Sequence, residues 1–227
     1  MRSLIPNMLT SLNLVLGMGS IMATIQEKFF FAGVFIILAM VADGLDGRVA
    51  RFFNASSEFG KELDSLCDLV SFGVAPALLA YSFLLKDFGY LGYFVAIMFA
   101  TCGALRLARF NVNTSVVKGY FMGLPIPAGG CLLATFIMLG VKPEGIIFPL
   151  MVMVFGYLMV STVKYPDFKG YGEKLRIIPV IIAGVMAVTI IYIVIKAGNI
   201  WGILFVPFIT YTVFGILNTA FGIFDQR

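Results

Sequence analysis

Four aspartates stand out in this chain of 227 residues, of which only 12% are charged. Asp43 and Asp46 are spaced i, i+3, and Asp64 and Asp68 are spaced i, i+4, within apolar stretches that predict helices. At about 100° per residue, the members of each pair lie within roughly 60° of each other around a helix. If the two helices pack as a hairpin, four carboxylates converge on one small volume. Such a cluster needs a counter-charge, and Mg²⁺ or Mn²⁺ is the kind of ion that binds carboxylate oxygens.

The residues beside the acids favour a ligand site over a solvated helix end. Gly47, Ala50 and Gly60 are small and leave room for a ligand against the helix backbone, and Arg51 supplies a fork of donors for a phosphate. Metal ions held by carboxylates can stabilise both the attacking and the leaving oxygen of a phosphoryl displacement. The alternative is an ion-translocation path, because acids within membranes often serve transport.

These residues form the pattern D-x-x-D-G-x-x-A-R-x8-G-x3-D-x3-D, which resembles the signature of the CDP-alcohol phosphotransferase family. The resemblance implies an integral membrane enzyme that displaces CMP from a CDP-alcohol by a hydroxyl nucleophile, with divalent metal on the aspartates. It implies that Asp68 is the base for that hydroxyl, which agrees with a chain that has no histidine. It also implies that Asn7, Thr10 and Ser57 lie against the diphosphate. Asn7 or Thr10 is alternatively an ordinary helix N-cap.

A second basic region follows the aspartates. Arg106 and Arg109 are spaced i, i+3, and Lys118 follows them. Each arginine alone is typical of a side chain that extends to lipid phosphates, whereas the pair beside four acids favours an anion site. Two prolines between glycines, in the sequence G-L-P-I-P-A-G at 123–129, predict a rigid entry into the next helix.

The sequence A-L-R-L-A-R-F-N, together with G-L-P-I-P-A-G, resembles the integral-membrane phosphatidylserine synthases of bacteria and archaea. The resemblance covers about residues 6 to 130. It implies CDP-diacylglycerol, or an archaeal ether analogue, and L-serine as substrates, with Arg106, Arg109 or Lys118 on the serine carboxylate. Other acceptors, such as glycerol 3-phosphate or an inositol phosphate, stay open. We therefore expect one membrane domain over 1–227, with its catalytic motif at 43–68 and its acceptor region at 106–130.

The composition independently predicts an all-α membrane protein with a polytopic bundle. The chain is 60% hydrophobic and its mean hydropathy is +1.00, well above that of soluble domains. A short interfacial segment over 6–13 is expected to cover the site before a bundle of about eight spans of about 20 residues each. The expected spans are Leu9–Gln26, Phe29–Arg51, Gly60–Leu85, Tyr90–Phe110, Ile126–Val141, Gly145–Val163, Ile177–Lys196 and Trp201–Phe224.

The basic residues predict the orientation of these spans. Eight spans put both termini on one side, and that side holds 12 of the 16 Lys and Arg residues. By the positive-inside rule this side is cytoplasmic, so the aspartates and both termini face the cytoplasm of a plasma-membrane protein. The opposite loops hold only Lys28, Lys86, Lys142 and Lys196.

The remaining features limit the partners. No soluble basic face is present, which excludes a nucleic-acid partner. Cys67, Cys102 and Cys131 lack CxxC spacing and predict core residues rather than disulfides. The polar loop 164–176 is expected to anchor on anionic membrane lipid or to line the site. The last two spans carry no chemical groups of note, and we expect them to form bundle walls or the interface of a homodimer.

Overall fold

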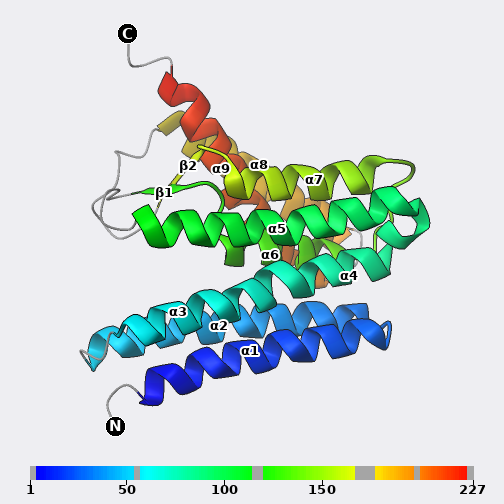
Figure 1. The fold of residues 1–227 in the computed structure, drawn as a ribbon. Coiled ribbons are helices and arrows are strands. Elements are labelled where there is room, and N and C mark those ends of the chain that lie inside the picture. The colour runs from blue at the N-terminus through cyan, green and yellow to red at the C-terminus, as the bar shows by residue number, and fades with distance from the viewer. Residues whose placement is uncertain (1–3, 54–56, 114–119, 167–176, 197–199, 224–227) are drawn as a thin grey trace.

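The computed structural model describes residues 4–53, 57–113, 120–166, 177–196 and 200–223. Helices dominate this part of the chain (Figure 1). They are α1 (Leu4–Ile25), α2 (Phe29–Phe52), α3 (Glu58–Asp68), α4 (Ala75–Phe83), α5 (Tyr90–Asn113), α6 (Ile126–Met138), α7 (Ile147–Val160), α8 (Ile177–Lys196) and α9 (Phe205–Ile223). A π-helical turn, Leu69–Val74, joins α3 to α4, and two 3₁₀ turns occupy Leu85–Phe88 and Ile200–Leu204.

The predicted all-α membrane architecture is confirmed. Each of the eight expected spans overlaps a helix or a run of consecutive helical segments, and Phe224, the end of the last one, lies outside the described residues. Five segments of the described chain are long and apolar enough to cross a membrane, and α6 and α7 are shorter apolar helices. The five are Ile5–Ile25, Phe29–Phe52, Glu58–Phe83, Tyr90–Val112 and Trp201–Ala220. The chain is therefore a multi-pass membrane protein.

The start of the chain differs from the expected interfacial segment. α1 runs without a break from Leu4, so Asn7 and Thr10 lie in its first turns and neither is an N-cap. Pro6 does not interrupt the helix there, because the first turn of a helix has no intrahelical use for its N–H groups. Residues 6–13, which were expected to form an interfacial segment over the site, are instead part of the membrane helix α1.

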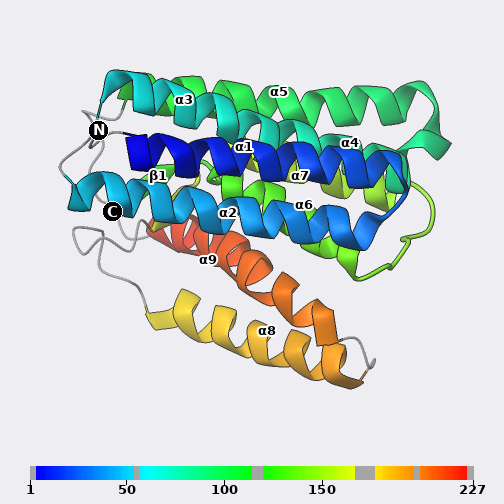
Figure 2. The same ribbon diagram turned by 90° about the horizontal axis from the view of Figure 1, so that it is seen from below.

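The helices pack as a bundle whose functional end is built from several of them. α1 lies along α2, α5 lies along α7, and α8 packs against α9 at the edge of the bundle (Figures 1 and 2). The start of α1, the end of α2, the start of α3 and the end of α5 lie at the same end of the bundle (Figure 1). Strands β1 (Tyr120–Met122) and β2 (Lys164–Pro166) lie there too. The aspartates at 43–68 and the arginines at 106–109 therefore belong to one end of the bundle.

Close packing around the π-helical turn brings α1 and α6 to the end of α3. A Cβ atom added at Gly17 of α1 would overlap Ser71, and one added at Gly130 of α6 would lie 2.7 Å from the carbonyl oxygen of Phe72. The Phe72 side chain is itself fully buried in the core. Small residues at these two positions are what let the neighbouring helices approach the turn that follows Asp68.

A short strand pair closes the functional end. β1 (Tyr120–Met122) pairs antiparallel with β2 (Lys164–Pro166). Gly123 then turns the chain with a positive φ of 80°, which favours glycine, and its N–H donates to the carbonyl oxygen of Val163 at 2.8 Å. Pro125 precedes α6 and Pro127 lies in its first turn. The helix therefore begins at the two prolines, where the sequence predicted its entry.

Candidate active site

Three of the four aspartates converge. Asp43 of α2 and Asp64 and Asp68 of α3 each place a carboxylate oxygen within 4.8 Å of the others. Asp68 is buried and the other two are half-buried. Three carboxylates this close repel one another unless a cation lies among them, and an all-oxygen donor set suits a hard divalent ion. These three residues could hold a metal.

Asp46 departs from the expectation that all four acids form one cluster. It lies one turn after Asp43 and turns toward α1, where its Oδ2 accepts a hydrogen bond from Thr10 Oγ1 at 2.6 Å. The two aspartates of α2 are separated by roughly 60° around the helix, so one can face α3 while the other faces α1. The structure thus divides the acids into a group of three and a fourth held by Thr10.

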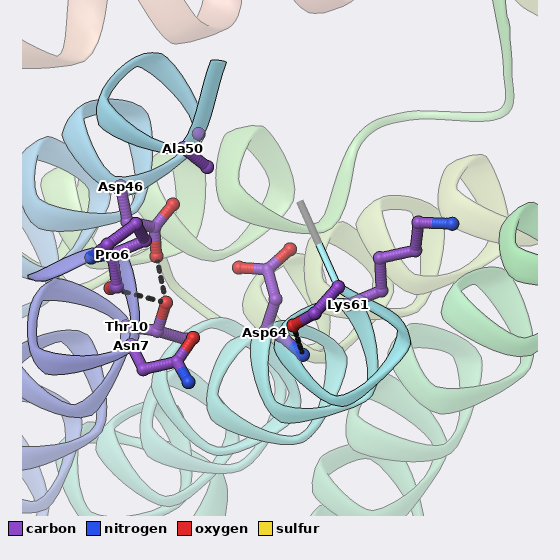
Figure 3. A pocket seen from close by; sticks show the side chains of 10 residues that line it. Pro6, Asn7, Thr10, Asp46, Ala50, Lys61 and Asp64 are labelled. Carbon is purple, nitrogen blue, oxygen red and sulfur yellow. Dashed lines mark hydrogen bonds between the residues drawn. The ribbon is translucent and has the colours of Figure 1, made fainter. Parts of the chain in front are cut away.

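A pocket lies beside the cluster (Figure 3). Its volume is about 150 Å³, which is smaller than the roughly 300–1,000 Å³ of sites that enclose a whole ligand and suits one polar part of a larger molecule. Its lining comes from α1, α2, α3 and the residue before α3. The lining residues are Pro6, Asn7, Thr10, Asp46, Gly47, Ala50, Ser57, Gly60, Lys61 and Asp64. Asp64 belongs to both the pocket and the carboxylate cluster, so the two are contiguous.

Local structure explains the small and hydroxyl residues of the pocket. Ser57 is the N-cap of α3, and its Oγ accepts the N–H of Gly60 at 3.0 Å. A Cβ atom at Gly60 would lie 3.1 Å from Ser57 Oγ and 3.4 Å from Asn7 Oδ1. Glycine is therefore what lets the start of α3 approach α1 at Asn7. Ser57, predicted as a phosphate ligand, is in place at the wall but its hydroxyl also caps the helix.

Two cations flank this pocket. Arg51 is exposed at the end of α2 and is not one of the lining residues, but its Nη1 reaches back to within 3.7 Å of where a Cβ would stand on Gly47. Lys61 of α3 does line the pocket and pairs with Glu58 at 3.0 Å across an exposed surface. In the sequence, Lys61 counted only as one of the 12 basic residues of the side expected to be cytoplasmic. The sequence held a signal for its place in the pocket, because Lys61 directly follows Gly60 of the aspartate motif.

Arg106 of α5 is not among the residues that line this pocket. It is 6% exposed and close enough to Asp68 and Asp43 to interact with their charges. Its guanidinium carbon stands 4.9 Å from the ring centroid of Phe110, and its Nε has no hydrogen-bond partner among the described residues. A buried cationic donor beside carboxylates, with capacity to spare, can receive an anion.

Arg109 does something different from its neighbour, contrary to the expectation of a matched anion-binding pair. Its guanidinium donates to four backbone carbonyls: Nη1 to Val160 at 2.8 Å, and Nη2 to Met122 at 2.9 Å, Ser161 at 3.0 Å and Met159 at 3.3 Å. Three of these carbonyls lie at or just after the end of α7, where helix carbonyls have no intrahelical donor, and the fourth lies at the end of strand β1. Arg109 therefore ties α5 to the end of α7 and to the strand pair. Lys118, the other predicted acceptor residue, lies outside the described residues.

Sequence reasoning gave no role to Asn13. Its Nδ2 donates to Oδ1 of Asp68 at 3.0 Å, and the whole residue is buried. The signal was present: Asn7, Thr10 and Asn13 recur every three residues in a largely apolar helix, and so form one polar stripe. Two members of that stripe each hold an aspartate of another helix.

Comparison with known proteins agrees with this arrangement. Residues 3–164 match the family model of CDP-alcohol phosphatidyltransferases, so the likeness extends beyond residue 130. The chain is 40% identical over 181 residues to CDP-diacylglycerol–serine O-phosphatidyltransferase of Helicobacter pylori, which covers 77% of this chain and 76% of that protein. It is also 40% identical over 171 residues to the Bacillus subtilis protein of the same name. This match covers 75% of this chain and 94% of that protein.

An archaeal relative carries a related name. Archaetidylserine synthase of Methanothermobacter thermautotrophicus is 40% identical over 172 residues, which cover 75% of this chain and 72% of that protein. The family match spans every residue of the aspartate motif, of the pocket and of the arginine region. With the carboxylate cluster and its adjoining pocket in place, the chain belongs to the CDP-alcohol phosphatidyltransferase family of enzymes.

Proposed function

We propose that this enzyme transfers a phosphatidyl group from CDP-diacylglycerol, or from an archaeal ether analogue, to the hydroxyl of L-serine and releases CMP. The observation that carries the proposal is the contiguity of the carboxylate cluster of Asp43, Asp64 and Asp68 with the pocket beside it. The relatives at 40% identity whose names specify serine as the acceptor or archaetidylserine synthesis support the choice of substrates.

The cofactor that we propose is Mg²⁺ or Mn²⁺. Asp43, Asp64 and Asp68 would hold it, because their oxygens are within 4.8 Å of one another and carboxylates are the ligands that these ions prefer. Asp46 would contribute to metal binding through its negative charge, because it lines the same pocket wall as Asp64. When bound, the metal supplies positive charge that stabilises the pyrophosphate and the departing CMP.

The pocket is the proposed site for the diphosphate of the CDP-lipid. Thr10 and Asn7 present polar groups from α1, and Ser57 presents its hydroxyl from the start of α3. Gly47, Ala50 and Gly60 keep the backbone accessible, and Arg51 lies at the edge beside Gly47 with donors for a phosphate. The volume of about 150 Å³ fits the phosphates, while the nucleoside and the lipid tails extend beyond it.

The chemical step needs a base and an anchor for the acceptor. Asp68 is proposed to take the proton of the serine hydroxyl while the serine oxygen forms a bond to the lipid-linked phosphorus. The bond from that phosphorus to the CMP oxygen breaks, and CMP leaves with the electron pair. Arg106 is proposed to bind the serine carboxylate, because it is buried near Asp68 and its Nε is unpartnered among the described residues. We leave Arg109 out of this role, because both of its terminal nitrogens donate to backbone carbonyls.

The proposed setting is the plasma membrane, with the site and both termini in the cytoplasm. The 12-to-4 partition of basic residues supports that orientation. The end of the bundle that carries the aspartates also carries the end of α5 with its two arginines (Figure 1). We further propose that the whole chain is one catalytic membrane domain, that membrane lipid surrounds it, and that α8 and α9 serve as bundle wall or homodimer interface.

The test is an acceptor panel. Purified protein with Mn²⁺ and CDP-diacylglycerol is given L-serine, glycerol 3-phosphate or an inositol phosphate, and CMP release is measured. We expect CMP with L-serine at least about 100-fold faster than with either phosphorylated alcohol. Equal or faster release with a phosphorylated alcohol would reassign the acceptor within the family.

A further inference from the structure

Asn13 joins α1 to the residue on which the proposed chemistry depends. Its Nδ2 donates a 3.0 Å hydrogen bond to Oδ1 of Asp68. Its backbone carbonyl accepts a second bond, of 3.0 Å, from Ser71 Oγ. Asp68 is the last residue of α3, and Ser71 lies within the π-helical turn that follows. One residue of α1 thus contacts the chain on both sides of this junction.

The junction needs such a contact. A π-helical turn departs from the regular helical ladder, so the direction of the residue before it is not set by the helix alone. Gly17, one turn after Asn13, lets α1 approach so closely that any side chain there would overlap Ser71. The backbone of α1 is therefore fixed against this turn. The side-chain amide of Asn13 then fixes Oδ1 of Asp68. The other carboxylate oxygen, Oδ2, makes no bond to Asn13.

Packing alone does not account for an asparagine at this position. Asn13 has no exposed surface, and its Oδ1 has no hydrogen-bond partner among the described residues. A buried acceptor without a partner is destabilising, and an apolar side chain would not incur this cost. The contact with Asp68 is what distinguishes asparagine from an apolar residue here.

We propose that Asn13 is a positioning residue, whose amide holds the Asp68 carboxylate in the orientation in which Asp68 joins Asp43 and Asp64 around a divalent cation. The inference rests on the metal-binding role proposed above for these three aspartates. Hydrogen-bond partners that orient a metal ligand typically change metal affinity by about 10- to 100-fold when they are removed. Asn13 acts through Asp68 and touches neither substrate in this account.

The experiment measures binding of Mn²⁺ alone to the full-length protein in detergent, by electron paramagnetic resonance of the free ion. Asn13→Ala should raise the Kd for Mn²⁺ by about 10- to 100-fold. Ser71→Ala is the matched control, because it removes the other hydrogen bond of the same contact and leaves the amide on Asp68. It should lower the melting temperature while the Kd for Mn²⁺ stays within about threefold of wild type.

A double-mutant cycle separates positioning from a general loss of structure. In the Asp68→Asn background, adding Asn13→Ala should weaken Mn²⁺ binding no further, because the carboxylate that it orients is gone. If Asn13→Ala is poorly folded by thermal denaturation, Asn13→Ser removes the same contact, since its hydroxyl is shorter than the amide. A Kd within about threefold of wild type in a folded Asn13 variant, or the same weakening with and without Asp68, would overturn the proposal.

This readout stands apart from catalysis. If the wild type binds Mn²⁺ and the cycle behaves as expected, the role of Asn13 holds even where L-serine is not the acceptor. If the wild type transfers to serine but Asn13→Ala leaves Mn²⁺ affinity unchanged, only the positioning role fails. A wild type that binds no Mn²⁺ removes the metal assignment and this inference with it.

Discussion

Thr10 Oγ1 donates a 2.6 Å hydrogen bond to Oδ2 of Asp46, and so joins the first turns of α1 to the last turns of α2. Both residues are buried and both line the pocket beside the carboxylate cluster. Three residues further along α1, Asn13 makes the corresponding contact with Asp68 of α3. One face of α1 thus positions an acid on each of the two helices that carry the motif.

The first prediction concerns the hydrogen bond from Thr10 to Asp46. Thr10→Val keeps the shape of the side chain but removes the hydroxyl, so Asp46 loses its donor at the pocket wall. A hydrogen bond to a charged group is worth on the order of 1.5–3 kcal/mol, and we expect the KM for CDP-diacylglycerol to rise roughly 10- to 150-fold. Thr10→Ser retains the donor and should stay within about threefold of wild type. Equal kinetics for the valine and serine variants would show that the bond does not serve lipid binding.

Gly60 makes the second prediction. An alanine Cβ there would lie 3.1 Å from Ser57 Oγ, so this hydroxyl of the pocket wall must shift, and 3.4 Å from Asn7 Oδ1. Overpacking of this kind costs about 1–3 kcal/mol, and the KM for the CDP-lipid should rise by roughly 5- to 150-fold. Gly44→Ala is the matched control, because nothing lies within 4 Å of its Cβ. Steady-state kinetics on both variants decide the point, and a loss of equal size in Gly44→Ala would contradict it.

The third prediction concerns the two arginines of α5, which have different partners in the structure. Arg106→Gln should raise the KM for serine by roughly 10- to 150-fold, since a charge-assisted bond to the carboxylate is lost. Arg109→Gln should instead lower the melting temperature, because four backbone carbonyls lose their donor. Titration of serine and thermal denaturation of both variants test this. A higher serine KM in Arg109→Gln at an unchanged melting temperature would restore it as an acceptor ligand.

The orientation in the membrane makes the fourth prediction. In a protein without Cys67, Cys102 and Cys131, single cysteines are placed at Lys169 and Lys142. Impermeant maleimide applied from each side of sealed vesicles should label position 169 from the cytoplasmic face and position 142 from the opposite face. Labelling of both positions from the same face would show that the chain crosses the membrane a different number of times between them.

Much of this protein could be predicted from its sequence, because hydropathy and spacing report directly on membrane helices. The eight expected ranges fall on helices, and the aspartate motif, with its period of three and four residues, was enough to bring Asp43, Asp64 and Asp68 together. Six of the seven residues expected to bind the CDP-lipid line the pocket. The seventh, Arg51, lies at its edge beside Gly47.

What the sequence did not reveal depends on rotation about helix axes and on backbone irregularity. Helical spacing put Asp46 near Asp43, but whether it faces α3 or Thr10 of α1 is decided by how three helices pack. The same holds for Arg106 and Arg109, which share a helix face yet reach different partners, one among the acids and the other at the end of α7. The π-helical turn after Asp68 has no spacing signature, and the role of Asn13 depends on it.

The lipid product formed from isotopically labelled L-serine tests the proposed reaction most directly. Purified protein in detergent, with CDP-diacylglycerol and Mn²⁺, should form a lipid that carries the serine label in a one-to-one ratio with CMP. Asp64→Asn should reduce this by several orders of magnitude, because it removes a charge shared by the cluster and the pocket, whereas Glu62→Gln, on an exposed position of the same helix, should not. CMP without label in the lipid, or full activity in Asp64→Asn or in excess EDTA, would contradict the account.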